Sequence, residues 1–120
     1  MAGEISITGL LRLANGLLSA QQQINGTADQ ATANARQFTQ SIATSETTVS
    51  FTGVTAARWV AIKNTDADNY VDVGPDSTGL VGMIRLLAGE SCVLPLKPST
   101  TIKAQANSAS VVISILALET

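Results

Sequence analysis

The sequence predicts an all-β fold, an antiparallel, jelly-roll-like β-sandwich with an N-terminal hairpin or arm. Three observations predict it. From about residue 36 onward, apolar and polar residues alternate in short runs rich in β-branched residues, as in strands with one buried face. Turn residues interrupt these runs about every 8–12 residues, a spacing typical of sandwiches and barrels. The length of 120 residues suits one hydrophobic core, and so a single domain overall.

Residues 1–35 are expected to form a hairpin and arm, and residues 36–120 the sandwich core. Asn15 and Gly16 stand between two apolar runs, and this pair predicts a tight type I′ hairpin turn. A second Asn-Gly pair follows at residues 25–26. Two such turns about ten residues apart fit a β-meander.

The polar, alanine-rich stretch that follows is open to two interpretations. Thr27 followed by Gln30 fits a capping box that begins a short helix over Asp29–Arg36. An irregular loop or an extended arm fits the same residues equally well. Both interpretations of residues 27–36 therefore stay open.

The alternating runs indicate which residues share one face of each sandwich strand. These sets are Phe38, Gln40 and Ile42; Val49 and Phe51; Arg58, Val60 and Ile62; Val71 and Val73; Cys92, Leu94 and Leu96; Ile102 and Ala104. Residues 111–118 are apolar on both faces, which predicts a strand covered on both sides, either centrally within the fold or by a neighbouring subunit. Pro95 predicts an edge strand or a bulge, because proline has no N–H to donate to a sheet.

Composition argues against several classes of function. The formal net charge of −2 and the pI near 4.8 argue against nucleic-acid binding, which normally needs a clustered basic face. No apolar segment approaches the roughly 18 residues of a membrane-spanning helix, so no membrane insertion is expected. The chain has no histidine and a single cysteine, which removes the commonest general base and any internal disulfide. We therefore expect no catalytic residues, no bound metal and no cofactor.

The polar surface is expected to consist mainly of hydroxyl and amide groups. Charged residues make up 13% of the chain, which contains 11 serines and 14 threonines. A typical soluble protein has about 25% charged residues and depends on them for solubility. A sparsely charged, hydroxyl-rich surface favours a protein that is packed against neighbours.

The acidic stretch NTDADN is the main candidate for a metal site. Asp66 and Asp68 match the first two ligand positions of an EF-hand loop, but Tyr70 stands in the place of the third ligand. An irregular calcium site formed by Asp66, Asp68 and Asp76 is the remaining metal hypothesis. The favoured interpretation is a hairpin loop over Thr65–Asn69, because Asn and Asp side chains readily close turns.

Four further features have a structural interpretation beside a chemical one. Asp72 and Glu90 would form a glycosidase-like carboxylate pair only if their strands face each other, and a solvent-facing position is favoured for Asp72. The run Gly74–Gly79 lacks the spacing and the lysine of a phosphate-binding loop and fits a turn. Cys92 has no basic neighbour and is expected to be a small core residue. Trp59 is either a partner anchor or the largest core side chain.

Four segments together carry a family resemblance: QSIATSETTVSF, ARWVAIKNTDADNYVDVG, MIRLLAGESCVLPL and TIKAQANSASVVISILALE. Over residues 36–119 the chain resembles a group of small virion structural proteins of tailed bacteriophages. In that group a Thr-Ser-Glu turn precedes a strand and an IKN-x-D-x-x-NYV hairpin follows. An LLAGE turn and an apolar C-terminal strand ending in Glu complete the pattern. The resemblance implies an all-β sandwich of the capsid or tail, and it rests on turns and strand faces rather than on catalytic residues.

This resemblance leads us to expect a non-enzymatic capsid decoration, or cement, protein that clamps neighbouring major capsid subunits on the virion. A homo-oligomer is expected, with a trimer favoured, and the N-terminal arm is the natural bridging element because an extended segment can add to a neighbour's sheet edge. The candidate partner contacts are Ile5, Ile7, Leu10, Leu11, Trp59 and Pro95.

Two other functions stay open. One is a tail, head–tail adaptor or fibre-associated protein of the same kind of virion, present in fewer copies. The other is a carbohydrate-binding β-sandwich module, which needs exposed aromatic residues to stack on sugars. The chain has only one Trp, one Tyr and two Phe, so the second alternative has the weaker support.

Overall fold

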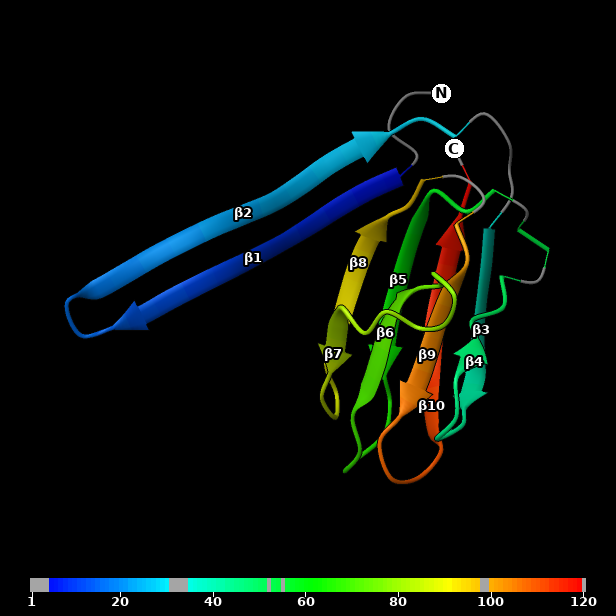
Figure 1. Ribbon diagram of the computed structural model, residues 1–120. Helices are drawn as coiled ribbons and strands as arrows, with labels where there is room; N and C mark the ends of the chain where they lie inside the picture. Colours follow the sequence, from blue (N-terminus) through cyan, green and yellow to red (C-terminus); the bar gives the residue numbers. More distant parts are fainter. Residues whose placement is uncertain (1–4, 31–34, 52, 55, 98–99, 120) are drawn as a thin grey trace. The chain divides into compact units, whose positions relative to one another are not determined.

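The structure is a computed structural model that describes residues 5–30, 35–51, 53–54, 56–97 and 100–119 (Figure 1). Every secondary-structure element assigned in these ranges is a β-strand, and every pair of neighbouring strands is antiparallel. The predicted all-β, antiparallel fold is therefore confirmed. Within the described ranges there is no helix of the length and apolarity that crossing a membrane requires.

The chain divides into two compact units, with the boundary after residue 33. The first unit contains a two-stranded hairpin of β1 (Ile5–Asn15) and β2 (Leu18–Ala28). The second unit is a β-sandwich. Its strands are β3 (Ala35–Ile42), β4 (Thr47–Thr48), β5 (Trp59–Asn64), β6 (Val71–Pro75), β7 (Ile84–Leu86), β8 (Ser91–Pro95), β9 (Ile102–Ala106) and β10 (Val111–Leu118).

The sandwich consists of two four-stranded sheets, seen as two layers in Figure 1. The β10 sheet has the strand order β3-β10-β5-β8, and the β9 sheet has the order β4-β9-β6-β7. The first and last strands of the sandwich, β3 and β10, are thus neighbours in one sheet. The second and second-last strands, β4 and β9, are neighbours in the other.

The hydrophobic core lies between the two sheets and is built from alternate residues of each strand. In β10, Val111, Ile113, Ile115 and Ala117 are fully buried, whereas Val112 is 44% exposed. This follows from the two-residue period of a strand, which sends successive side chains to opposite faces. The predicted central position of β10 is confirmed, since it lies between β3 and β5. Coverage of its outer face by a neighbouring subunit stays a prediction.

The predicted strand faces and the edge position of Pro95 are also found. Ile42, Val60 and Ile62 are buried, and Phe38 packs against the same core. Pro95 is the last residue of β8, the strand that ends the β10 sheet. A proline is tolerated there because a free edge needs no N–H on its outer side.

The N-terminal hairpin forms, but its turn differs from the predicted one. Asn15 pairs with Leu18, so the loop consists of Gly16 and Leu17 rather than of Asn15 and Gly16. Gly16 has a φ of +59°, and Thr78 is the only non-glycine residue in the described ranges with a positive φ. A positive φ at the first loop residue alone indicates a type II′ turn, so the predicted type I′ turn is wrong.

The second predicted turn is also wrong. Asn25 and Gly26 lie within β2, where they pair with Thr8 and Ile7. The register set at the hairpin turn continues along both 11-residue strands, and the paired backbone outweighs the local turn preference of one Asn-Gly pair. The expected β-meander is therefore replaced by one long hairpin.

Of the two interpretations of residues 27–36, the short helix over Asp29–Arg36 is contradicted at its C-terminal end, and Thr27, its cap in that interpretation, still belongs to β2. β3 already begins at Ala35, and residues 29–30 are irregular. Residues 31–34, the middle of this segment, lie outside the described residues.

Candidate interaction surfaces

The register of the hairpin sorts its side chains into an apolar and a polar face. Directly paired residues of an antiparallel ribbon share one face. The apolar ribbon face consists of the pairs Ile5–Ala28, Ile7–Gly26, Gly9–Ile24, Leu11–Gln22 and Leu13–Ala20. The opposite face consists of the pairs Ser6–Thr27, Thr8–Asn25, Leu10–Gln23, Arg12–Gln21 and Ala14–Ser19. The ribbon is therefore amphipathic.

Most of the apolar ribbon face is uncovered. Leu11 is 71% exposed, Leu13 48% and Ile24 52%, whereas Ile5 is buried and Ile7 half-buried. A two-stranded hairpin is at best marginally stable alone in water, because it has no second layer against which to bury side chains. The exposed part of this face is thus a candidate contact surface.

A second apolar surface crosses the outer face of the β10 sheet at one end. Cross-strand pairing gives two adjacent rows, Ala35–Leu118–Trp59–Pro95 and Gln37–Leu116–Ala61–Val93. The next row, Thr39–Ser114–Lys63–Ser91, is polar. We call the apolar residues that β10, β5 and β8 contribute to the first two rows the outer strip: Trp59, Ala61, Val93, Pro95, Leu116 and Leu118. Its members are half-buried or exposed, with Val93 at 48%.

Trp59 belongs to the outer strip and not to the buried core. It is half-buried, it pairs with Pro95, and the residues that form the core cluster do not include it. The guanidinium carbon of Arg58 lies 5.0 Å from the centre of its ring, within the range of a cation–π interaction. The interpretation of Trp59 as the largest core side chain is therefore wrong, and its role as a partner anchor stays a prediction.

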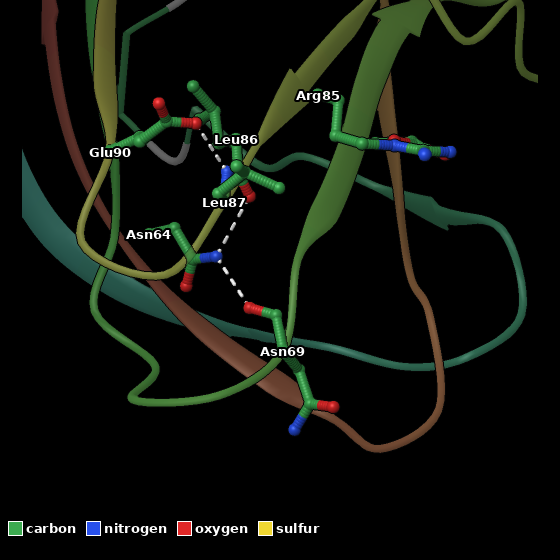
Figure 2. A network of polar contacts seen from close by, with 7 residues as sticks. Asn64, Asn69, Arg85, Leu86, Leu87 and Glu90 are labelled. Carbon is green, nitrogen blue, oxygen red and sulfur yellow. Dashed lines mark hydrogen bonds and ion pairs between the residues drawn. The ribbon is translucent and has the colours of Figure 1, made fainter.

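The acidic stretch after β5 is organised by Asn64, which is fully buried. Its Nδ2 donates to the carbonyl oxygens of Asn69 at 2.8 Å and Leu86 at 3.0 Å (Figure 2). Its Oδ1 accepts the backbone N–H of Asp66 at 2.9 Å. The side chain thus ties the loop to β7, as expected for a buried amide whose hydrogen-bonding groups are satisfied.

The carboxylate of Asp66 closes the same loop. Its Oδ2 accepts the backbone N–H groups of Asn69 at 2.6 Å and Asp68 at 3.0 Å. These hydrogen bonds, with that from Asn69 the stronger influence, lower the pKa of Asp66 because they favour the charged form. Thr65–Asn69 is a loop, as predicted, but it connects β5 of one sheet to β6 of the other, so the predicted hairpin is wrong.

The predicted irregular calcium site of Asp66, Asp68 and Asp76 is not supported by a cluster of ligands in the described ranges. In the described ranges, no three His, Cys, Asp or Glu side chains come together in a group that could hold a metal ion. Asp76 is engaged elsewhere, since its Oδ1 accepts the backbone N–H of Gly79 at 3.0 Å and lies 3.7 Å from Nζ of Lys103. The carboxylates of Asp66 and Asp76 therefore each close a separate turn.

Asp72 and Glu90 also have separate partners. Asp72 forms a two-point ion pair with Arg85 across β6 and β7, at 2.8 and 3.1 Å. The Arg85 guanidinium carbon lies 4.0 Å from the centre of the Tyr70 ring. Glu90 accepts the backbone N–H of Leu87 at 2.7 Å and closes the turn before β8 (Figure 2). Both carboxylates have structural roles in these contacts.

The remaining motifs also have structural roles. Gly74 lies where an added Cβ would come within 1.8 Å of the backbone oxygen of Val81, so this glycine permits a close approach of two chain segments. Thr78 and Gly79 have positive φ values of 55° and 122°, as in a tight turn rather than a phosphate-binding loop. Cys92 is half-buried against the core, and burial raises the pKa of its thiol, which disfavours the reactive thiolate.

The structure divides the predicted contact residues between the two surfaces. Ile5, Ile7 and Leu11 lie on the apolar ribbon face, and Trp59 and Pro95 pair within the outer strip. Leu10 is 54% exposed but lies on the polar face of the ribbon, opposite Gln23. Sequence reasoning missed several members of these surfaces, although the two-residue period of each strand was a signal that could have found them. Among them are Leu13, Ile24, Val93, Leu116 and Leu118.

Comparisons with protein-family models, with curated proteins and with solved structures found no match to this chain.

Proposed function

We propose that this chain is a non-enzymatic structural protein of a bacteriophage virion, namely a decoration protein that binds neighbouring major capsid subunits and stabilises the shell. The virion setting comes from the resemblance over residues 36–119. The bridging role comes from the two surfaces described above. Neither part of the proposal requires a catalytic or metal-binding residue.

The observation that carries the proposal is uncovered apolar surface on both units of one small, sparsely charged chain. Leu11 and Ile24 are exposed in the hairpin, and Val93 is exposed in the outer strip. Burial of apolar surface stabilises a complex by about 25 cal/mol per Å². Covering either surface with a partner therefore lowers the free energy of the complex. A protein with two such surfaces can join two neighbours, and a repeating shell multiplies that contribution.

The strand order of the sandwich supports the same proposal. Counted from one to eight along the chain, the strands of the described sandwich run 1-8-3-6 in the β10 sheet and 2-7-4-5 in the β9 sheet. We propose that this nested order is a jelly roll, an eight-stranded fold found in viral capsid and lectin domains. Because one fold serves many functions, the order adds to the proposal without carrying it.

Purified virions test the proposal through copy number and heat stability. A decoration protein is expected at hundreds of copies per particle by quantitative gel densitometry, and adding it back to depleted shells is expected to raise their melting temperature. A few copies per particle, with shells equally heat-stable without it, would indicate a tail or adaptor protein. Absence from virions together with saturable glycan binding would indicate a carbohydrate-binding module.

A matched pair of variants tests whether the outer strip contacts the shell. Val93→Glu places a charge within the strip, whereas Ser91→Glu places the same charge on the same strand and face but in the polar row. Shell binding by Val93→Glu is expected to weaken about tenfold or more, since charges are disfavoured at the centre of an interface. Binding by Ser91→Glu is expected to stay near that of the unsubstituted protein. Equal loss in both variants contradicts a role specific to the strip.

A further inference from the structure

An apolar cavity lies at one end of the sandwich, where β6 and β8 end and β7 and β9 begin. We call it the end cavity. Strands of both sheets contribute to it, Ile84 from β7 and Leu94 from β8, so it lies between the two layers. Figure 1 shows β7 and β8, the edge strands of the two sheets, on the same side of the sandwich. The end cavity has a volume of about 210 Å³, and its lining includes Val73, Ile84, Leu94, Leu96, Lys97 and Ile102.

The interior of the end cavity consists of side chains of the hydrophobic core. Val73, Leu96 and Ile102 are buried, and Ile84 and Leu94 are half-buried against the same core. In the described ranges every buried side-chain nitrogen and oxygen atom has a hydrogen-bond partner, so no buried polar side chain there requires a polar ligand. Apolar cavities stay dry and bind apolar molecules. The interior therefore favours a hydrocarbon occupant.

The mouth of the end cavity is positively charged. Of the described residues that line the cavity, Lys97 is the only ionisable one, and it is exposed, which places it at the mouth. Lys97 forms no ion pair with another described residue. Asp76, which follows the lining residue Pro75 in the chain, faces Nζ of Lys103 at 3.7 Å instead. A carboxylate at the mouth therefore gains a charge-assisted hydrogen bond from Lys97, and no acidic lining residue repels it.

The volume of the end cavity limits the length of the hydrocarbon chain. Benzene, with its six carbon atoms, fills an apolar cavity of about 150 Å³, which is about 25 Å³ per non-hydrogen atom. By that ratio the 210 Å³ of the end cavity holds about eight non-hydrogen atoms, the number in hexanoate. With the carboxylate at the mouth, a chain of about eight carbons still fits. The longer acyl chains of membrane lipids exceed this length.

We propose that the end cavity binds an unbranched aliphatic carboxylate of about six to eight carbons. The hydrocarbon chain lies among Val73, Leu94 and Ile102, and the carboxylate lies at Lys97. The apolar interior selects the chain, the lysine selects the charged end, and the volume selects the length. This inference does not rest on the proposed function, because the end cavity lies between the sheets and the capsid contacts are proposed on the hairpin and the outer strip.

Titration of the full chain with hexanoate, followed by NMR, tests the proposal. Millimolar hexanoate is expected to shift the methyl resonances of Ile84, Leu94 and Ile102 in a saturable way, whereas those of Ile24 in the hairpin stay unchanged. Each CH₂ added between butanoate and octanoate is expected to tighten binding by about fourfold, because it leaves water for the cavity. Dodecanoate is expected to bind no more tightly than octanoate, because the cavity is then full.

Two lysine variants test the contact with the carboxylate. Lys97→Gln is expected to weaken hexanoate binding by about three- to tenfold. The same variant is expected to bind hexanol as the unsubstituted protein does, because an alcohol does not use the charge. Lys63→Gln is the matched control, since Lys63 is an exposed lysine in the polar row on the outer face of the β10 sheet, and its hexanoate binding is expected to stay unchanged.

A second pair of variants tests the cavity itself. Leu94→Trp places a larger side chain in the lining of the end cavity and is expected to weaken hexanoate binding about tenfold or more, because the ring takes the space of the ligand. Val93→Trp is the matched control, since Val93 is the adjacent residue of β8 and belongs to the outer strip. Circular dichroism confirms that each variant is folded. Lys97→Gln, at an exposed position, keeps the test decisive if Leu94→Trp does not fold.

Four outcomes overturn the proposal. One is millimolar hexanoate that shifts no methyl resonance of the end cavity, and another is shifts confined to the hairpin or the outer strip. Equal affinities of the unsubstituted protein for hexanol and hexanoate remove the carboxylate contact. Loss of capsid-shell binding in Leu94→Trp, without any binding of hexanoate, assigns the cavity to an apolar side chain of the shell. Because the titrations use isolated protein, a chain that binds hexanoate but not shells refutes the proposed function alone.

Discussion

The β1–β2 hairpin and the β-sandwich consist of the same kind of strand, yet they differ in what covers their apolar side chains. In β10, Ile113 and Ile115 are fully buried by the facing β9 sheet. In the hairpin, Leu11 and Leu13 lie on either side of Arg12, just as Ile113 and Ile115 lie on either side of Ser114, but the two leucines are exposed. The alternation is the same, and the second layer makes the difference. The comparison shows that a strand pattern specifies an apolar face without specifying which molecule covers it.

The largest loss of unfolding free energy is expected from shortening a core side chain. Shortening a side chain of the hairpin serves as the comparison. Ile115→Ala leaves a cavity at a fully buried position and is expected to lower the free energy of unfolding by about 3–4 kcal/mol. Leu13→Ala, at a position 48% exposed, is expected to change it by less than about 0.5 kcal/mol. Denaturant unfolding followed by Trp59 fluorescence measures both. Similar losses would show that the hairpin and the sandwich share one core.

A smaller loss of unfolding free energy is expected from removing the side-chain amide of Asn64, which ties the acidic loop to β7. Asn64→Ala removes two donated hydrogen bonds and one accepted one, and it is expected to cost about 2–4 kcal/mol because buried partners are left unsatisfied. Asn69→Ala is the control, since it keeps the backbone carbonyl that Asn64 uses, and it is expected to cost less than about 1 kcal/mol. If Asn69→Ala costs as much as Asn64→Ala, the buried amide does not organise the loop.

The sequence predicted the sandwich better than the hairpin, for a physical reason. In β5 the two-residue period is a direct result of one buried face, so the pattern identifies both the strand and its inward residues. In β10 both faces are apolar, so the pattern identifies the strand and its central position but not its inward face. The pairs Asn15-Gly16 and Asn25-Gly26 carry the same local signal, but one lies at the turn and the other within β2. The register of the whole ribbon decides between them, and a dipeptide does not contain that information.

The same limit explains the candidate contacts. Leu10 and Leu11 are adjacent and both apolar, and nothing in their local pattern separates them. The cross-strand pairs place Leu11 on the apolar face and Leu10 on the polar one, opposite Gln23. The outer strip likewise needs β10, β5 and β8 side by side before Leu116, Ala61 and Val93 form a row. Surfaces built across strands depend on long-range pairing, which composition and periodicity do not supply.

The smallest change in unfolding free energy is expected from acidification. It is expected in the sandwich and not in the strands of the hairpin. Hydrogen bonds from Asn69 and Asp68 lower the folded-state pKa of Asp66, so its contribution to stability is present above the unfolded-state pKa of about 4 and is lost as the pH falls below it. The unfolding free energy of the sandwich is therefore expected to decrease on acidification from about pH 5 to pH 2, and Asp66→Asn is expected to flatten part of that decrease. Asp68→Asn keeps the backbone N–H groups that bind Asp66 and is expected to retain the slope. β1 and β2 contain no Asp or Glu, so the two strands of the hairpin are not expected to contribute to this decrease. If Asp66→Asn and the unsubstituted protein lose the same unfolding free energy on acidification, the Asp66 loop does not contribute to the decrease.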